Sequence, residues 1–288
     1  MKINKAVITA AAPDQPRLPL QSLVDKNGDD RTSLQLIVEE VIHAGVEEIC
    51  IVVRPGDHQS YAAAAVDHAQ RLEFIEQDDP KGYADALLRA KDFVGEDPFL
   101  HLIGDHIYLS NTERCCAAQL IDIASREECA VSAVQATRER MLPYFGTVGA
   151  NRIAQQNRLF QVKRVIEKPT PTVAEQELVV AGLHSGLYLC IFGMHVLTPA
   201  FMEILQQQSD ADGPTHISNA LSTLAEREQY LAYELEGSRF NIGVKYGLLR
   251  AQLEMALAGN DRDMILTELV EILARRGGTG VASTGATS

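Results

Sequence analysis

The sequence predicts an α/β fold, with a mostly parallel sheet covered by helices on both faces. Three observations lead to this prediction. The spacing of the apolar residues switches repeatedly between about two and about 3.6 residues. Several short apolar runs show no polar alternation, which is typical of strands that are buried on both faces. Helical segments separate these runs, and strand–helix alternation at this spacing favours parallel strands with crossover helices.

The first half of the chain supplies the predicted parallel part of the sheet. The apolar runs predict strands over residues 6–12, 49–53, 72–76, 99–103 and 130–136. The 3.6-residue pattern predicts helices over residues 34–42, 61–70, 84–93 and 113–124. We expect the first of these helices to end at Gly45, because glycine readily adopts the left-handed conformation that stops a helix.

From about Met141 the pattern changes, and the sheet is expected to gain mixed or antiparallel strands. Strands are predicted over 145–149, 159–166 and 186–192, with less helix between them. Thr198 and Pro199 resemble a helix cap and first helical residue, so a helix is expected to run to about residue 207. We therefore predict one domain over 1–276, with a core of about 1–250, C-terminal helices over about 244–276 and a disordered tail over 277–288.

Composition excludes several classes of function. The 288-residue chain carries 39 acidic and 26 basic side chains, a net charge of −13, which argues against a broad nucleic-acid-binding face. It has no apolar run of about 18 residues that could span a membrane, and its N-terminal segment is too short for a secretory signal. The five cysteines show no C-x-x-C spacing, so we expect reduced thiols in the cytoplasm.

Residues that follow the predicted strands are candidates for a binding site, because ligands of open parallel sheets lie beyond the carboxyl ends of the strands. Each residue alone is common in turns and helix caps. Together they bring cations, glycines and carboxylates to one edge of the sheet, which suits a phosphate ester with a divalent metal. The charged and amide residues at these ends are Arg17, Gln77, Lys81, Asp105, Glu167, Lys168, Asn241 and Lys245.

An ordered series of short motifs resembles the sugar-1-phosphate nucleotidyltransferases, and in particular the bacterial glucose-1-phosphate uridylyltransferases. The series runs KAVITA, SLVDK, VEEVIHAGVEEICIVV, EQDDPKGYADALL, GDHIY, YFGTV, VIEKP, SGLYL and NIGVKYG. The resemblance extends from Lys5 to about Ala251. It implies a Rossmann-like fold of the nucleotide-diphospho-sugar transferase type. It also implies formation of UDP-glucose and pyrophosphate from UTP and glucose 1-phosphate, so a nucleoside triphosphate and a sugar 1-phosphate are the expected partners.

The resemblance also implies roles for individual residues. Arg17 and Asp105 would be catalytic, and Asp105 and Asn241 would occupy the two metal positions for Mg²⁺. The remaining matched residues would bind substrate: Gln77 the base, with Gly82 packed against it, Gly146 and Gly186 beside the sugar, Glu167 a sugar hydroxyl, Lys168 the sugar phosphate, and Lys245 at the last strand end.

The chain departs from the family pattern in its catalytic parts. Members carry a glycine-rich G-x-G-T-R loop whose backbone amides hold the triphosphate, whereas this chain has AAAPDQPRLPL. Arg17 aligns with the family arginine only across a gap, and the lysine that normally follows has no counterpart. Asn241 stands where members have a second metal-binding aspartate.

These departures leave three hypotheses open. The first is an active uridylyltransferase in which Arg17 and Lys81 serve the triphosphate. The second is a catalytically impaired paralogue that binds a sugar nucleotide or sugar phosphate as a regulatory or partner subunit. The third is an unrelated doubly wound α/β domain. The predicted C-terminal helices are compatible with a homo-oligomer.

Overall fold

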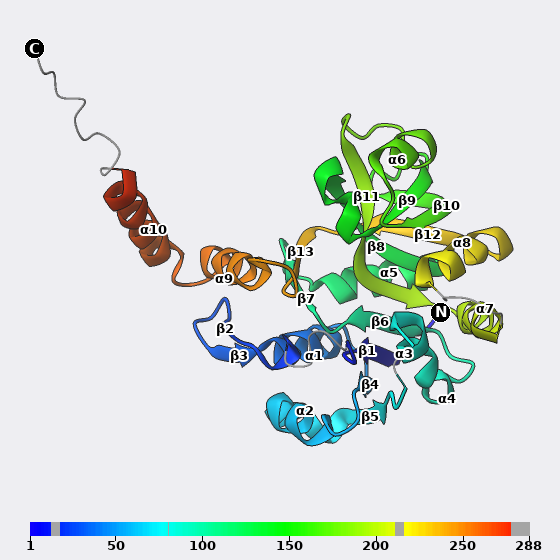
Figure 1. Cartoon of the computed structure of the whole chain (residues 1–288), viewed down its shortest axis with the longest axis horizontal. Helices are drawn as coiled ribbons and strands as arrows, with labels where there is room; N and C mark the ends of the chain where they lie inside the picture. Colours follow the sequence, from blue (N-terminus) through cyan, green and yellow to red (C-terminus); the bar gives the residue numbers. More distant parts are fainter. Residues whose placement is uncertain (13–17, 80, 211–215, 278–288) are drawn as a thin grey trace, which may run out of the picture.

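A nine-stranded mixed sheet forms the centre of the computed structural model, which describes residues 1–12, 18–79, 81–210 and 216–277 (Figure 1). The strand order is β5-β4-β1-β6-β11-β8-β12-β10-β9. The nine strands are β1 (Lys5–Thr9), β4 (Glu48–Val53), β5 (Leu72–Glu76), β6 (Phe99–Ile103), β8 (Ala130–Arg138), β9 (Gly146–Arg152), β10 (Leu159–Glu167), β11 (Leu187–Leu197) and β12 (Tyr230–Glu234). All of them except β10 and β11 run in the same direction. The predicted mostly parallel sheet and its antiparallel additions after Met141 are thus confirmed.

Helices cover both faces of the sheet, as the sequence predicts. On one face α1 (Ser33–His43), α2 (His58–Ala65) and α5 (Cys116–Glu127) bury their apolar sides in one cluster of the core. On the other face α3 (Tyr83–Arg89), α7 (Pro199–Asp210) and α8 (Ile217–Arg227) pack against a second cluster. Each helix thereby removes apolar surface from water, which stabilises the three-layer arrangement.

The remaining elements lie around this centre. Two small antiparallel ribbons pair β2 (Ser22–Val24) with β3 (Asp30–Thr32), and β7 (His106–Ser110) with β13 (Gly237–Asn241). The other helices are α4 (Lys91–Val94), α6 (Pro171–Glu177), α9 (Gly247–Ala258) and α10 (Arg262–Gly277), with 3-10 turns η1 (Leu18–Leu20), η2 (Val66–Arg71) and η3 (Glu139–Tyr144). Figure 1 shows α9 and α10 leading away from the sheet towards the C-terminus. No helix within the described ranges is long and apolar enough to cross a membrane.

Most predicted boundaries agree with the structure to within a few residues. Strands β5 and β6 match the predicted ranges 72–76 and 99–103 residue for residue. The predicted helix 84–93 is two helices, α3 and α4, because the chain breaks at Ala90. Helix α1 begins with a capping box between Thr32 and Gln35, and Gly45 follows it with φ +86°, so the predicted helix end is confirmed. The predicted tail after Gly277 lies outside the described residues.

A bulge in β11 joins the sheet to the ribbon formed by β7 and β13. The pairing of β11 with β8 shifts register between Ile191 and His195, and Gly193 within this shift has φ +83°. The Tyr108 hydroxyl of β7 donates a hydrogen bond to the Gly193 carbonyl oxygen over 2.7 Å. A Cβ atom at Gly193 would lie 3.3 Å from Cδ2 of His106. The bulge therefore requires glycine both for its backbone conformation and for the close approach of β7.

Replacing this glycine tests the importance of the bulge. We expect Gly193→Ala to lower the free energy of unfolding by about 2–4 kcal/mol, because a positive φ and a crowded Cβ both oppose the change. The control is Gly45→Ala, which has φ +86° but nothing within 4 Å of its Cβ, and should cost only about 1–2 kcal/mol. Urea denaturation of both variants measures the difference. Equal losses would show that contact with His106 is unimportant.

Candidate functional site

A cavity of about 390 Å³ lies where the ends of β10, the bulge of β11 and the start of α8 meet. It is lined by five of the residues that the sequence nominates: Lys81, Gly82, Gly146, Glu167 and Lys168. Tyr83, His106, Gly193, His195, His216 and Ser218 also line it. The structure therefore brings together side chains and glycines from segments that are separated by more than 130 positions in the sequence. We call this the sugar-phosphate cavity, after the ligand that the resemblance implies for Glu167 and Lys168.

Glu167 and Gly146 face each other across the β9–β10 pair. They are register partners, and a Cβ on Gly146 would lie 3.2 Å from Glu167 Oε2. The Ser218 hydroxyl donates a hydrogen bond of 2.6 Å to the same carboxylate oxygen. Glu167 is thereby oriented by α8, and the missing side chain at Gly146 leaves room beside it.

Lys168 follows Glu167 in an unusual backbone conformation. Its φ is +45°, which is uncommon for a residue with a side chain, and its amide donates to the Phe145 carbonyl oxygen over 3.3 Å. The ammonium lies 3.9 Å from Glu167 Oε1, and the side chain is 58% exposed. Because water screens so exposed a pair, the contact contributes little to stability and leaves the lysine available to a ligand.

The predicted metal residues are held next to each other by the β7–β13 ribbon. Asp105 lies in the turn before β7, and Asn241 is the register partner of His106 in that ribbon. The amide of Ile242 donates to the Asp105 carbonyl oxygen over 2.9 Å. Asn241 Oδ1 accepts a hydrogen bond of 2.8 Å from the amide of Gly243. This pair supplies one carboxylate and one neutral amide oxygen.

His106 controls the charge of the Asp105 carboxylate. Burial raises the pKa of Asp105, but the neighbouring His106 ring, with Nδ1 at 2.6 Å from Oδ1, lowers it more, so the net shift is downward. The carboxylate is therefore ionised at neutral pH. A side chain that hydrogen-bonds to a metal-binding carboxylate, as His106 does to Asp105, commonly orients that carboxylate.

Gln77 is placed differently from its expected role. The side chain is only 2% exposed, and its Nε2 donates to the Gly82 carbonyl oxygen over 3.1 Å and to Asp85 Oδ2 over 2.6 Å. Packing against Gly82 is as expected. The amide, however, holds the loop before α3 and does not line the sugar-phosphate cavity, so contact with a base stays a prediction.

Two further nominated residues, Gly186 and Lys245, do not line this cavity. Gly186 has φ +78° in the turn before β11, where its carbonyl oxygen accepts from the Glu139 amide over 3.0 Å. Lys245 is exposed after β13, with its ammonium 5.2 Å from the centroid of the Tyr246 ring. Arg17 lies outside the described residues. The roles that the resemblance implies for these three remain predictions.

His195 forms part of the cavity floor and stacks on His101, which does not line the cavity; the sequence analysis anticipated neither histidine. His195 contacts Ser132 Oγ through Nδ1 at 2.5 Å, and its ring stacks on His101 at 5.7 Å. Burial lowers the pKa of His195 to about 3 and that of His101 well below its ordinary value. The floor is therefore neutral at physiological pH, and positive charge for a phosphate comes from Lys168 and Lys81 at the rim.

Ser218 and His216 were also missed as site residues. They lie in the segment HISNAL, at the start of α8. The short hydrogen bond from Ser218 to Glu167 depends on how α8 packs against β10, so no local sequence pattern predicts it.

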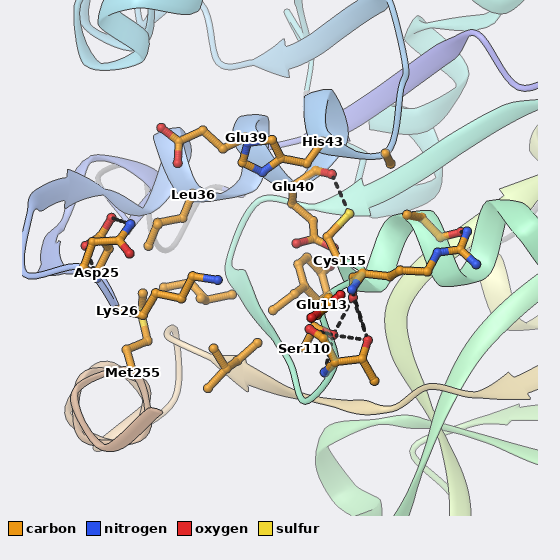
Figure 2. A pocket seen from close by; sticks show the side chains of 18 of the residues that line it. Asp25, Lys26, Leu36, Glu39, Glu40, His43, Ser110, Glu113, Cys115 and Met255 are labelled. Carbon is orange, nitrogen blue, oxygen red and sulfur yellow. Dashed lines mark hydrogen bonds between the residues drawn. The ribbon is translucent and has the colours of Figure 1, made fainter. Parts of the chain in front are cut away.

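A different cavity, of about 740 Å³, lies between α1, the β2–β3 ribbon and the start of α5 (Figure 2). None of the nominated residues lines it. Glu40 Oε1 accepts a hydrogen bond of 2.7 Å from the Ala117 amide, and the Cys115 thiol donates to the Glu40 carbonyl oxygen over 3.6 Å. Burial raises the pKa of the Glu40 carboxyl to about 7, although the hydrogen bond from Ala117 opposes the shift.

This raised pKa predicts a pH-dependent stability. The folded pKa of Glu40 exceeds its ordinary value of 4.5, so the folded state holds the proton more tightly. Its contribution is therefore most favourable below pH 4.5, and about 3 kcal/mol is lost as the pH rises to 7 and above. We expect Glu40→Gln, which keeps the acceptor oxygen, to remove this loss when denaturation is followed from pH 5 to pH 8. The exposed Glu47→Gln is the control. If the free energy of unfolding changed with pH in the same way in the parent and in Glu40→Gln, the raised pKa of Glu40 would be contradicted.

Comparison with known protein families gives a consistent match. The model of the nucleotidyl transferase family matches residues 22–256. The matched region starts directly after the proline-rich segment that departs from the family pattern.

Curated relatives match over most of the chain. The chain is 28% identical to a UTP–glucose-1-phosphate uridylyltransferase of Bacillus subtilis, over 92% of this chain and 95% of that protein. It is 30% identical to UTP–glucose-1-phosphate uridylyltransferase 2 of Streptococcus pyogenes serotype M1, over 89% of this chain and 91% of that protein.

Solved structures show the same fold. A UDP-glucose pyrophosphorylase complexed with UDP-glucose superposes with a TM-score of 0.71 at 21% identity, over 87% of this chain and 97% of the other. A UTP-bound UGPase from Acinetobacter baumannii gives a TM-score of 0.72 at 20% identity, over 93% and 99%. The expected nucleotide-diphospho-sugar transferase type of fold is confirmed.

Proposed function

The chain belongs to the nucleotidyl transferase family, and we propose that it forms UDP-glucose and pyrophosphate from UTP and glucose 1-phosphate. In this reaction a phosphate oxygen of the sugar phosphate attacks the α-phosphorus of UTP. The bond between that phosphorus and the bridging oxygen of pyrophosphate breaks. Curated relatives that carry the name of this activity support the proposal, because each aligns over about nine-tenths of both chains.

The observation that carries the proposal is the sugar-phosphate cavity. Lys168 provides an exposed ammonium for the phosphate of glucose 1-phosphate, and Glu167 provides a fixed carboxylate for a sugar hydroxyl. Gly146 leaves the space that a sugar ring needs beside that carboxylate. Transfer at phosphorus depends mainly on positioning and on neutralising the phosphate oxygens, which are the tasks these residues suit.

Mg²⁺ is part of the proposal, and the donor set at Asp105 and Asn241 fits it. Mg²⁺ is commonly bound by one or two carboxylates, with waters and substrate phosphates completing its shell. The described residues contain no cluster of three or more His, Cys, Asp or Glu side chains that would hold a metal without substrate. Asp105 Oδ2 and Asn241 would therefore hold the ion, which would neutralise charge on the phosphate oxygens of UTP.

Asn241 favours a second candidate, the catalytically impaired paralogue that binds a sugar nucleotide or sugar phosphate. Its amide carries no charge, and its oxygen already accepts a hydrogen bond from Gly243. Both features weaken attraction for Mg²⁺ compared with a carboxylate. The two candidates share the sugar-phosphate cavity and differ in turnover, so activity assays separate them.

We further propose that the protein is a cytoplasmic homo-oligomer. All five cysteines are unpaired, and four are buried, which suits a reducing compartment. Val270 and Leu273 of α10 are 64% and 70% exposed, an arrangement that would favour contact with another copy of the chain.

Removing the Lys168 ammonium tests the cavity directly. We expect Lys168→Ala to weaken UDP-glucose binding about tenfold, because one charge-assisted contact to phosphate is lost. The backbone strain is unchanged, since alanine and lysine have similar difficulty with a positive φ. Calorimetric titration measures the affinity, and Lys91→Ala, an exposed lysine on α4, is the control. Unchanged affinity of Lys168→Ala would refute the assignment of the cavity.

Restoring a carboxylate at position 241 tests the metal site and the two candidates. We expect Asn241→Asp to lower the Mg²⁺ concentration required for pyrophosphate release from UTP and glucose 1-phosphate, because a second negative charge attracts the cation. The exposed Asn151→Asp on β9 is the control for charge alone. A parent turnover of about 1–1,000 per second would eliminate the impaired candidate. An unaltered Mg²⁺ requirement in Asn241→Asp would argue against a metal role at this position.

A further inference from the structure

A second small cavity lies on the other side of Phe145 from the sugar-phosphate cavity. Its volume is about 270 Å³, and it is lined by the end of β8, by η3, by β13 and by the start of α9. Phe145 lines both cavities, so its ring separates them. We call this second space the arginine cavity, because Arg138, Arg140, Arg239 and Arg250 line it.

The charge around this cavity is unusual for the chain. The chain as a whole has a net charge of −13, yet no carboxylate is among the described residues that line the arginine cavity. None of the four arginines forms an ion pair within the part of the chain that the structure describes. Four arginines therefore line one space that has no carboxylate among its described lining residues, and an anion there would offset their positive charge.

Arg239 is the buried member of this group. Its residue is only 8% exposed, and its Nε and Nη1 atoms are buried without a hydrogen-bond partner within the described ranges. The guanidinium carbon lies 3.8 Å from the centroid of Phe145, and this stacking fixes its plane. Burial lowers the pKa of Arg239 to about 10, so the group is still charged at neutral pH. A buried charge with unsatisfied donors is unfavourable unless a ligand supplies acceptors.

We propose that the arginine cavity binds a small phosphorylated anion at a site separate from the sugar-phosphate cavity. Arg239 donates from the buried wall, while Arg138 and Arg250 reach the anion from exposed positions at the end of β8 and on α9. Guanidinium groups match phosphate oxygens through paired hydrogen bonds. Gly247, the first residue of α9, also lines the cavity, so the positive end of that helix dipole adds to the attraction.

The size of the cavity limits the ligand class. Pockets for drug-sized ligands have volumes of about 300–1,000 Å³, and 270 Å³ falls just below that range. The space therefore suits a phosphate group with little attached to it. Inorganic pyrophosphate and a simple phosphate or phosphomonoester share the required chemistry. Where the anion is pyrophosphate, the inference deepens the proposed function and rests on it, since Asn241 of the proposed metal site also lines this cavity. Binding measured without Mg²⁺ and nucleotide tests the cavity separately from turnover.

The test measures anion binding in the absence of Mg²⁺ and nucleotide. Pyrophosphate and orthophosphate are titrated calorimetrically into the full chain at constant ionic strength, set with chloride. We expect Arg138→Gln and Arg250→Gln each to weaken binding about five- to tenfold, and the double variant to weaken it further. Both arginines are exposed, so these variants should fold. Arg71→Gln, an exposed arginine far away in η2, carries the same charge change and should bind like the parent.

Two additional measurements make the test specific. Because Lys168 is itself proposed to contact a phosphate in the other cavity, the titrations are repeated in the Lys168→Ala background. There the remaining anion binding should still weaken in the Arg138→Gln and Arg250→Gln variants, and binding that no longer depends on these arginines would overturn the proposal. Arg239→Met should abolish binding in a protein whose circular dichroism matches the parent. Stronger binding of pyrophosphate identifies it as the ligand, whereas comparable binding of orthophosphate identifies a simple phosphate. Failure of both anions to bind, or unchanged affinity in the Arg138 and Arg250 variants, would also overturn the proposal.

Discussion

The arrangement of the site depends on strand β11 and on the bulge at Gly193. Strand β11 pairs with β8 on both sides of the bulge, with β9 before it through Leu189 and Cys190, and with β6 of the parallel half after it, over residues 194–197. One strand thereby joins the parallel half of the sheet to the mixed half. At the bulge, the Tyr108 hydroxyl holds β7 against the Gly193 carbonyl oxygen. Because β7 follows Asp105 and pairs with the strand that ends at Asn241, this one hydrogen-bonded bulge positions both predicted metal residues.

Electrostatics divide the site into a neutral floor and a charged rim. His101 and His195 lie opposite each other on β6 and β11, and burial keeps both rings uncharged at neutral pH. Ser132 bonds to both His195 and Tyr230, so the polar atoms beneath the cavity are satisfied across neighbouring strands. The floor can thus support the cavity without attracting an anion into the sheet. Binding of phosphate is left to cations at the rim, where solvent exposure avoids the penalty of burying a charge.

The sequence predicts those features that local pattern controls. Strands β5 and β6 follow directly from short apolar runs, and Glu167 and Lys168 follow from their position at the end of β10. The β7–β13 pairing could not be predicted, because its partners are more than 120 residues apart and each strand has five residues. The sequence does not predict whether the Gln77 amide contacts a ligand or Asp85, because side-chain packing decides between them. Nor does it single out Arg239, because the burial of this side chain against Phe145 appears only in the folded structure.

Asn241 connects the two cavities physically. It lies two residues after Arg239 on the same strand, so both side chains project from the same side of β13, and it lines the arginine cavity. An aspartate here would place a carboxylate beside four arginines and would compete with any anion for their donors. The neutral amide removes this competitor and, at the same time, removes one of the charges that Mg²⁺ would use. This one departure from the family pattern therefore leaves the described lining of the arginine cavity without a carboxylate beside Arg239, and leaves Asp105 as the carboxylate of the proposed metal pair.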